Sequence, residues 1–184
     1  MSSQQHPYAV NDPEAALKYA IRHIDADRVE IVEGRIRPVL PSWDHESVGH
    51  LIREQLRPVL DRIGCLAGSG DLDLPGTSNW YVPDLAVVAN EAAKGGAELV
   101  PAQTRLIVEI TSEGTADTDR TVKRRRYAEY RAPLYLLVDR QERACTLFAV
   151  PGELGYTRVE GPYPFGTPVT LPEPFRLDLD TSEF

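Results

Sequence analysis

Two apolar, β-branched runs of strand length, residues 81–89 and 104–111, are the feature that most limits how this chain can fold. Such runs are typical of the central strands of a sheet. If the two are antiparallel neighbours, a register that pairs residue 84 with residue 109 also pairs 88 with 105 and leaves 90–103 as the connection. Asp84 and Glu109 then lie on the same face of adjacent strands, about 5 Å apart. We therefore expect two carboxylates side by side on the sheet.

Two adjacent carboxylates repel each other, and a hard divalent cation removes the repulsion. Mg²⁺ takes oxygen ligands at about 2.0 to 2.1 Å, so the pair predicts a magnesium site. Lys123 follows on the next expected helix, where an ammonium can stabilise charge on a metal-bound phosphate or help to deprotonate an attacking water. Asp119 lies four residues before it, and an ordinary helical ion pair is the competing interpretation of Lys123.

Helical and strand periodicity predicts the elements around this pair. The expected helices are residues 13–25, the segment between a Ser42 cap and Gly64, and a helix from 115 or 117 to 131. The expected strands are a hairpin over 29–39, an edge strand at 71–74, a hairpin of 134–139 with 144–150, and short edge strands with loops after 151. Helices and strands therefore alternate in the α/β manner.

The size and charge of the chain exclude several classes of protein. Its 184 residues fit a single domain over 1–184, with 1–11 flexible. No apolar run approaches the roughly 20 residues of a spanning helix, and the polar start lacks a signal-peptide pattern, which favours the cytoplasm. Cys65 and Cys145 make no metal pattern, so we expect reduced thiols. The net charge of −8 has the wrong sign for a general nucleic-acid coat, so any DNA contact must be local.

Four stretches of the sequence resemble one known family. They are Val82-Pro83-Asp84-Leu85-Ala86-Val87-Val88, Leu106-Ile107-Val108-Glu109-Ile110-Thr111-Ser112, the positions Thr115, Asp119, Lys123 and Tyr127, and Leu134-Tyr135-Leu136-Leu137-Val138-Asp139. Together they resemble the Uma-two family of restriction-endonuclease-like proteins, which belongs to the PD-(D/E)XK nuclease superfamily. The resemblance covers nearly the whole chain and implies an α/β restriction-endonuclease-like fold, with a central mixed β-sheet flanked by α-helices.

The resemblance also implies roles for individual residues. By position, Asp84 and Glu109 are metal ligands and Lys123 is the catalytic lysine. The superfamily usually has its lysine two residues after the acidic residue, where this chain has Thr111. In this family the lysine has moved to the helix.

Further site residues follow from the same resemblance. Glu30, in the first hairpin, is implied as an additional carboxylate, and Asp119 as the residue that orients Lys123. Tyr127 either packs in the core beneath the site or touches the substrate. His45 opens the second helix and lies either at the mouth of the site or on the surface.

Three consecutive arginines form the densest basic segment of this acidic chain. Arg124, Arg125 and Arg126 point in different directions around a helix, so they cannot all face one DNA backbone. They are candidate DNA contacts, and the alternative is a solvated helix face paired with nearby acidic residues.

The function that we expect is a Mg²⁺-dependent (or Mn²⁺-dependent) endonuclease acting on DNA. Asp84 and Glu109 would hold the metal, which polarises the phosphate and lowers the pKa of a bound water, and Lys123 would stabilise the pentavalent state. Two alternatives stay open: a catalytically silent nuclease-fold module that binds a protein or nucleic acid, and a hydrolase of a smaller phosphate ester. Cleavage of both DNA strands would be easiest for a symmetric homodimer.

Overall fold

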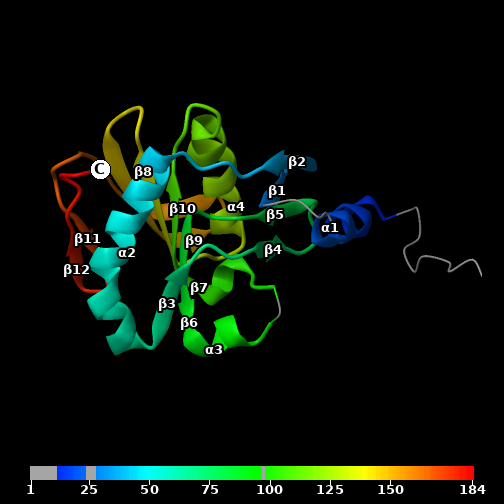
Figure 1. The fold of residues 1–184 in the computed structure, drawn as a ribbon, viewed down its shortest axis with the longest axis horizontal. Helices are drawn as coiled ribbons and strands as arrows, with labels where there is room; N and C mark the ends of the chain where they lie inside the picture. Colours follow the sequence, from blue (N-terminus) through cyan, green and yellow to red (C-terminus); the bar gives the residue numbers. More distant parts are fainter. Residues whose placement is uncertain (1–11, 24–27, 97) are drawn as a thin grey trace, which may run out of the picture.

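A six-stranded mixed sheet forms the centre of the computed structural model, which describes residues 12–23, 28–96 and 98–184 (Figure 1). In spatial order its strands are β10 (Gly155–Pro164), β9 (Ala144–Gly152), β8 (Leu134–Asp139), β7 (Thr104–Ile110), β6 (Leu85–Ala89) and β3 (Cys65–Gly68). Neighbours are antiparallel except for β7 and β8, which are parallel. The predicted mixed sheet is confirmed. Residues 1–11, predicted to be flexible, and residues 24–25, predicted to end the first helix, lie outside the described residues.

A smaller sheet lies beside the central one. Its strands, in order, are β2 (Arg35–Pro38), β1 (Val29–Val32), β5 (Asn79–Tyr81) and β4 (Leu72–Leu74), so β4 is the edge strand expected at 71–74. The predicted hairpin of β1 and β2 turns at Glu33 and Gly34, which have φ values of 47° and 75°. A two-residue I′ turn needs positive φ at both positions. Helix α1 (Pro13–His23) packs Ile21 against β1 and β5.

Strand β7 sends its side chains alternately to two cores. Leu106, Val108 and Ile110 pack against helix α2 (Trp43–Ile63), which is capped by Ser42 and ended by Gly64 in the left-handed conformation, as predicted. Ile107 belongs to the opposite core, formed with the helical segment of η2 (Thr118–Lys123) and α4 (Arg124–Glu129). Glu109 has the same parity as Ile107 and therefore faces η2 and α4.

The predicted strand 81–89 is wrong in one respect, because it is two strands in different sheets. Tyr81 ends β5 in the small sheet, and β6 begins at Leu85 in the central sheet. Between them stands Pro83, which has no N–H to give to a strand ladder. The predicted register holds for Leu85↔Val108 through Val87↔Leu106, but a shift then pairs Val88 with Thr104 instead of residue 105.

Other elements depart from the sequence pattern locally. The helix expected to reach 131 contains a π-helical turn, η2, and α4 ends at Glu129. The connection 90–103 carries two short helices, α3 (Asn90–Lys94) and η1 (Pro101–Gln103). After 151 the chain forms a ten-residue edge strand, β10, instead of short pieces only, followed by the small hairpin of β11 (Val169–Leu171) and β12 (Leu177–Leu179). These errors arise because periodicity does not show which backbone hydrogen bonds a segment will make.

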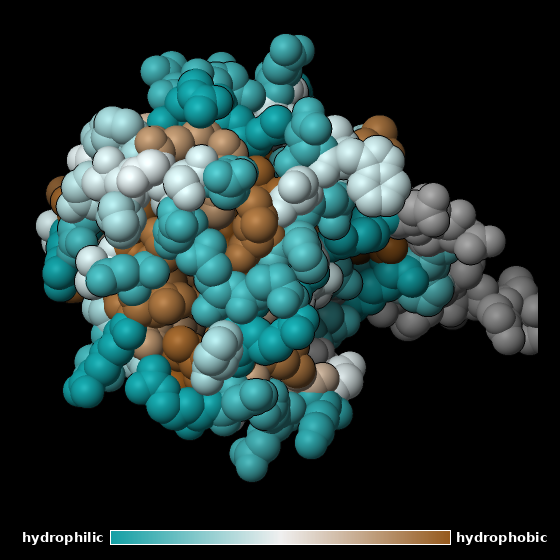
Figure 2. Space-filling view, turned by 60° about the vertical axis from the view of Figure 1, so that its left-hand side comes forward, coloured by the Kyte–Doolittle hydropathy of each residue, from teal (hydrophilic) through white to brown (hydrophobic). Residues whose placement is uncertain are grey.

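The surface is mostly hydrophilic on the face shown in Figure 2, and both cysteines are reduced. Figure 2 brings forward the side of the molecule that carries α2, and hydrophilic side chains cover most of it, with hydrophobic atoms showing in patches. No helix among the described residues is long and apolar enough to cross a membrane. Cys65 and Cys145 are free thiols and are buried.

Candidate active site

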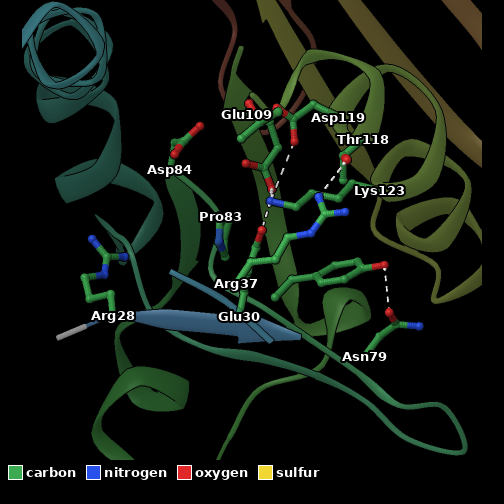
Figure 3. A network of polar contacts seen from close by, with 12 residues as sticks. Arg28, Glu30, Arg37, Asn79, Pro83, Asp84, Glu109, Thr118, Asp119 and Lys123 are labelled. Carbon is green, nitrogen blue, oxygen red and sulfur yellow. Dashed lines mark hydrogen bonds and ion pairs between the residues drawn. The ribbon is translucent and has the colours of Figure 1, made fainter. Parts of the chain in front are cut away.

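Lys123 lies at the centre of a buried group of carboxylates. Its Nζ atom is 3.0 Å from Glu30 Oε2, 3.2 Å from Glu109 Oε1 and 3.6 Å from Asp119 Oδ1 (Figure 3). The side chains of all four residues are at most 7% exposed. Glu30 comes from β1, Glu109 from β7, and Asp119 and Lys123 from η2. Three segments that are far apart in the sequence therefore meet at one ammonium.

Asp84 occupies the position directly before β6. Its Oδ2 accepts a hydrogen bond from the Ile110 N–H at 2.6 Å, so the carboxylate holds the end of β7. His45 Nε2 lies 2.8 Å from the Ile110 carbonyl oxygen and 3.2 Å from Asp84 Oδ2. Burial by itself lowers the pKa of His45. The Asp84 carboxylate and the Ile110 carbonyl raise this pKa by more than burial lowers it, so the net shift is upward. The surface position considered for His45 is wrong, since its ring is buried against the site.

These residues open onto a small cavity of about 120 Å³. Its lining includes Glu30, His45, Asp84, Glu109, Asp119 and Lys123, together with the segment 38–42 and the residues Val82, Ile110, Ser112 and Thr115. A larger cavity of about 590 Å³ lies elsewhere, among α1, β3, β6 and α3, and none of the clustered residues line it. The acidic cluster therefore lies apart from this larger cavity.

Aromatic rings form the floor beneath Lys123. The Tyr127 hydroxyl donates to Glu109 Oε1 at 2.5 Å, and its ring is fully buried against Tyr81 and Tyr135. Tyr127 therefore packs in the core and also contacts a site carboxylate. Lys123 Nζ lies 5.6 Å from the centroid of the Tyr81 ring, a cation–π distance. The sequence does not reveal that Tyr81 belongs to the site, because no pattern shows that the end of β5 lies beside Lys123 of η2.

Negative charge in this cluster exceeds positive charge. Among the described residues, the carboxylates of Glu30, Glu109 and Asp119 contact the ammonium of Lys123, and Asp84 adds a fourth negative charge nearby. Burial raises the pKa of Glu109 well above its usual value, Lys123 lowers it, and the neighbouring carboxylates raise it again. Burial likewise raises the pKa of Asp119 to about 6. Burial lowers the pKa of Lys123, but the carboxylates outweigh it and hold that pKa well above its usual range.

Thr111, two residues after Glu109, makes its hydrogen bonds outside the acidic cluster. Its Oγ1 donates to Gln141 Oε1 at 2.5 Å and accepts from the Arg140 N–H at 2.9 Å. The side chain is fully buried and ties the end of β7 to the turn after β8. Lys123, and not Thr111, therefore provides the ammonium that contacts the carboxylates of Glu30, Glu109 and Asp119.

The three arginines of the basic segment have different surroundings. Arg126 forms a bidentate ion pair with Glu33, at 2.8 and 2.9 Å, and also binds Glu129. Arg124 lies over the Phe148 ring, 5.2 Å from its centroid. Arg124 and Arg125 are exposed and line a separate cavity of about 340 Å³. The segment therefore combines one paired arginine with two exposed ones.

Replacing Tyr127 by phenylalanine tests the contact beneath Glu109. We expect the free energy of unfolding to fall by about 1.5–3 kcal/mol, because a buried hydrogen bond to a carboxylate is lost. The matched control is Tyr135→Phe, which removes a neutral bond from the Tyr135 hydroxyl to the Asp119 carbonyl and should cost about 0.5–1.5 kcal/mol. Urea unfolding measures both. Equal losses of unfolding free energy in the two variants would mean that the hydrogen bond from Tyr127 to Glu109 is no stronger than a neutral one.

Comparisons with known proteins place the chain in a family. The model of the Uma2 family, described as "Putative restriction endonuclease", matches residues 17–182. The chain belongs to the Uma2 family. No curated protein matches this Uma2 chain. Nothing in the comparisons supports the homodimer expected for cleavage of both strands.

Two solved structures resemble this Uma2 protein. A "putative nuclease belonging to DUF820" from Anabaena variabilis has a TM-score of 0.70 and 16% identity, covering 91% of this chain and 95% of that one. This match shows a shared fold, so the restriction-endonuclease-like fold implied by the sequence is confirmed. The type IIG restriction endonuclease BpuSI has a TM-score of 0.38 and 14% identity over 70% of this chain and 15% of its own. That score is too low to support any argument.

Nucleases with this fold generally use divalent metal ions, and the Uma2 cluster fits such an ion in its donor chemistry. Its candidate ligands are carboxylate oxygens, and the buried atoms Glu30 Oε2 and Asp119 Oδ1 have no hydrogen bond of good geometry beyond their ion pairs with Lys123. Within residues 12–23, 28–96 and 98–184, no three acidic, histidine or cysteine side chains form a ready metal site. Mg²⁺ commonly binds through one or two carboxylates, with water and phosphate as its other ligands. Asp84 and Glu109 are thus sufficient in number.

Proposed function

We propose that this protein is a divalent-metal-dependent endonuclease of the PD-(D/E)XK type that hydrolyses phosphodiester bonds of DNA in the cytoplasm. The observation that carries the proposal is the buried ammonium of Lys123 among an excess of carboxylates at the wall of a cavity. Buried charges that are not balanced destabilise a fold, so such a cluster is typical of a functional site. The family and the fold support the same reading.

In the proposed mechanism the residues of the cluster have separate tasks. Asp84 and Glu109 would hold Mg²⁺ or Mn²⁺, and such an ion would supply Lewis-acid polarisation of the phosphate and activation of a water molecule. Lys123 holds a fixed positive charge at the cavity wall, where it stabilises the negative charge that develops on the phosphate.

Other residues position these groups. His45 and the Ile110 backbone fix the Asp84 carboxylate, and the Tyr127 hydroxyl fixes the Glu109 carboxylate. Glu30 and Asp119 hold Lys123 from two further sides. Preorganised charges of this kind need no rearrangement as the reaction proceeds.

A catalytically silent module is the second candidate function, and one observation favours it. Lys123 Nζ already pairs with the carboxylates of Glu30, Glu109 and Asp119, so the cluster has a structural cation of its own. In a silent module the cluster would only join β1, β7 and η2. The two candidates differ in whether the protein turns over a phosphodiester.

Incubation of the purified protein with supercoiled plasmid separates the two functions. We expect nicked and then linear DNA with Mg²⁺ or Mn²⁺ and intact plasmid with a chelator, because the carboxylates need a cation to act on phosphate. Labelled RNA and a small phosphodiester, run in parallel, distinguish DNA cleavage from action on other esters. Unchanged substrate in every arm, from a protein shown to be folded, would favour the silent module.

A further inference from the structure

Arg37 is a cation that lies beside the acidic cluster, but among the described residues it forms no ion pair with the carboxylates of the cluster. The register of the first hairpin places Arg37 on β2 directly opposite Glu30 on β1. Residues paired directly across two antiparallel strands point to the same face. Figure 3 shows both side chains on the side of the hairpin that carries Lys123, with the Arg37 guanidinium reaching toward η2.

The guanidinium of Arg37 has most of its hydrogen-bonding capacity free. Its Nη1 donates to the Thr118 hydroxyl at 3.1 Å, and the Glu30 carboxylate opposite binds Lys123 instead. Among the described residues, Arg37 forms no ion pair. By contrast, Arg120 binds Asp139 through two nitrogens, and Arg126 binds Glu33 in the same way. An arginine has five N–H donors, so four remain for another acceptor.

The position of Arg37 explains what kind of acceptor would bind there. The side chain is half-buried, the next residue along the chain, Pro38, lines the cavity, and Thr118 precedes the cluster residue Asp119. A nucleic-acid strand that enters this cavity brings negative phosphates toward an excess of carboxylates. A guanidinium beside this cavity offsets that repulsion, and its planar fork fits two oxygens of one phosphate.

We propose that Arg37 binds a backbone phosphate of the substrate strand next to the scissile position. This proposal rests on the proposed nuclease function and adds to it the residue that anchors the strand. It assigns the anchoring to β2, not to the arginines of α4. Arg37 takes no part in bond breaking; it holds the strand while Asp84, Glu109 and Lys123 act on the phosphate.

The test compares Arg37→Ala with the wild type in DNA binding and in cleavage. Binding of a labelled duplex is measured by fluorescence anisotropy in Ca²⁺ over a series of KCl concentrations, and cleavage kinetics in Mg²⁺. We expect Kd and KM to rise about tenfold, because a charge-assisted contact is lost. The slope of log affinity against log salt should fall by about 0.9, the value for one phosphate contact, while kcat stays within about threefold.

Three further variants separate anchoring from structural effects. Arg37→Lys keeps the charge and should restore the salt slope but not the full affinity, since the fork is lost. Thr118→Val removes the internal hydrogen bond but leaves Arg37 in place, and should bind DNA like the wild type. Arg105→Ala removes an exposed charge near the start of β7 that forms no ion pair within the part of the chain that the structure describes, and should also bind like the wild type.

The outcomes distinguish this inference from the proposed function. A wild-type salt slope and KM in Arg37→Ala would overturn the anchoring role, and so would an equal loss in Thr118→Val. If the wild type binds DNA with an Arg37-dependent slope but cleaves no substrate, the nuclease function fails and the phosphate contact stands. If it cleaves DNA without any dependence on Arg37, the nuclease function stands and the inference fails.

Discussion

Replacing Asp84 by asparagine should lower metal-dependent DNA cleavage by about a thousandfold. The amide removes one negative ligand of the divalent ion, and metal activation contributes several kcal/mol to a reaction of this type, with each 1.4 kcal/mol worth a factor of ten. The fold should survive, because an amide oxygen can still accept the Ile110 N–H that Asp84 now accepts. Single-turnover cleavage measures the rate, and thermal unfolding without metal checks the fold.

Metal binding by the same variant gives an independent readout. Mg²⁺ or Mn²⁺ should raise the melting temperature of the wild type, because a ligand that binds only the folded state stabilises it. Asp84→Asn should lose most of this gain. The control is Asp71→Asn, an exposed carboxylate that lines the other cavity, which should keep it. Equal metal binding by wild type and Asp84→Asn in calorimetry would place the metal elsewhere.

Replacing Lys123 by methionine should destabilise the protein by about 3–5 kcal/mol at neutral pH and abolish cleavage. The change leaves Glu30, Glu109 and Asp119 buried without their cation, and removing one partner of a buried ion pair has a cost of this size. Urea unfolding measures it. Adding Glu109→Gln to the same chain should recover part of the loss but no activity, since one uncompensated charge is removed.

A matched control and a pH series sharpen this prediction. Arg126→Met removes a partly exposed paired arginine and should cost at most about 1 kcal/mol. Asp119 has a folded-state pKa of about 6 against 3.8 normally, so between these values the folded protein binds a proton that the unfolded chain releases. The contribution of Asp119 to stability therefore falls as the pH rises from about 4 to 6. Without Lys123 this fall should be steeper and extend to higher pH; a Lys123→Met protein whose stability does not change with pH would contradict the assignment.

Elements whose apolar face and end signals lie within one continuous segment were predicted well. Helix α2 has its apolar face, its Ser42 cap and its Gly64 terminus within one continuous segment. The register of β6 against β7 was predicted because a slip by one residue would turn every buried side chain outward. The division between β5 and β6 was missed, because both are apolar and only Pro83 marks the crossing from one sheet to the other.

The candidate site was predictable where two strands define it and less so where distant segments meet. The pair Asp84 and Glu109 follows from one register, and Lys123 from the resemblance to the family. The burial of His45 and the place of Tyr81 depend on contacts across the fold that a single residue in a sequence does not reveal. The π-helical turn that carries Lys123 depends on backbone hydrogen bonds and not on side-chain periodicity.

The ammonium of Lys123 connects the small sheet with the central sheet. Glu30 belongs to the small sheet and Glu109 to the central one, and both bind the same nitrogen. If the hairpin of β1 and β2 opened alone, Glu30 would leave with it, and Lys123 would lose one of its partners. Local unfolding of the small sheet is therefore coupled to disassembly of the cluster. Amide hydrogens on β1 should accordingly gain protection from exchange through the ion pair between Glu30 and Lys123.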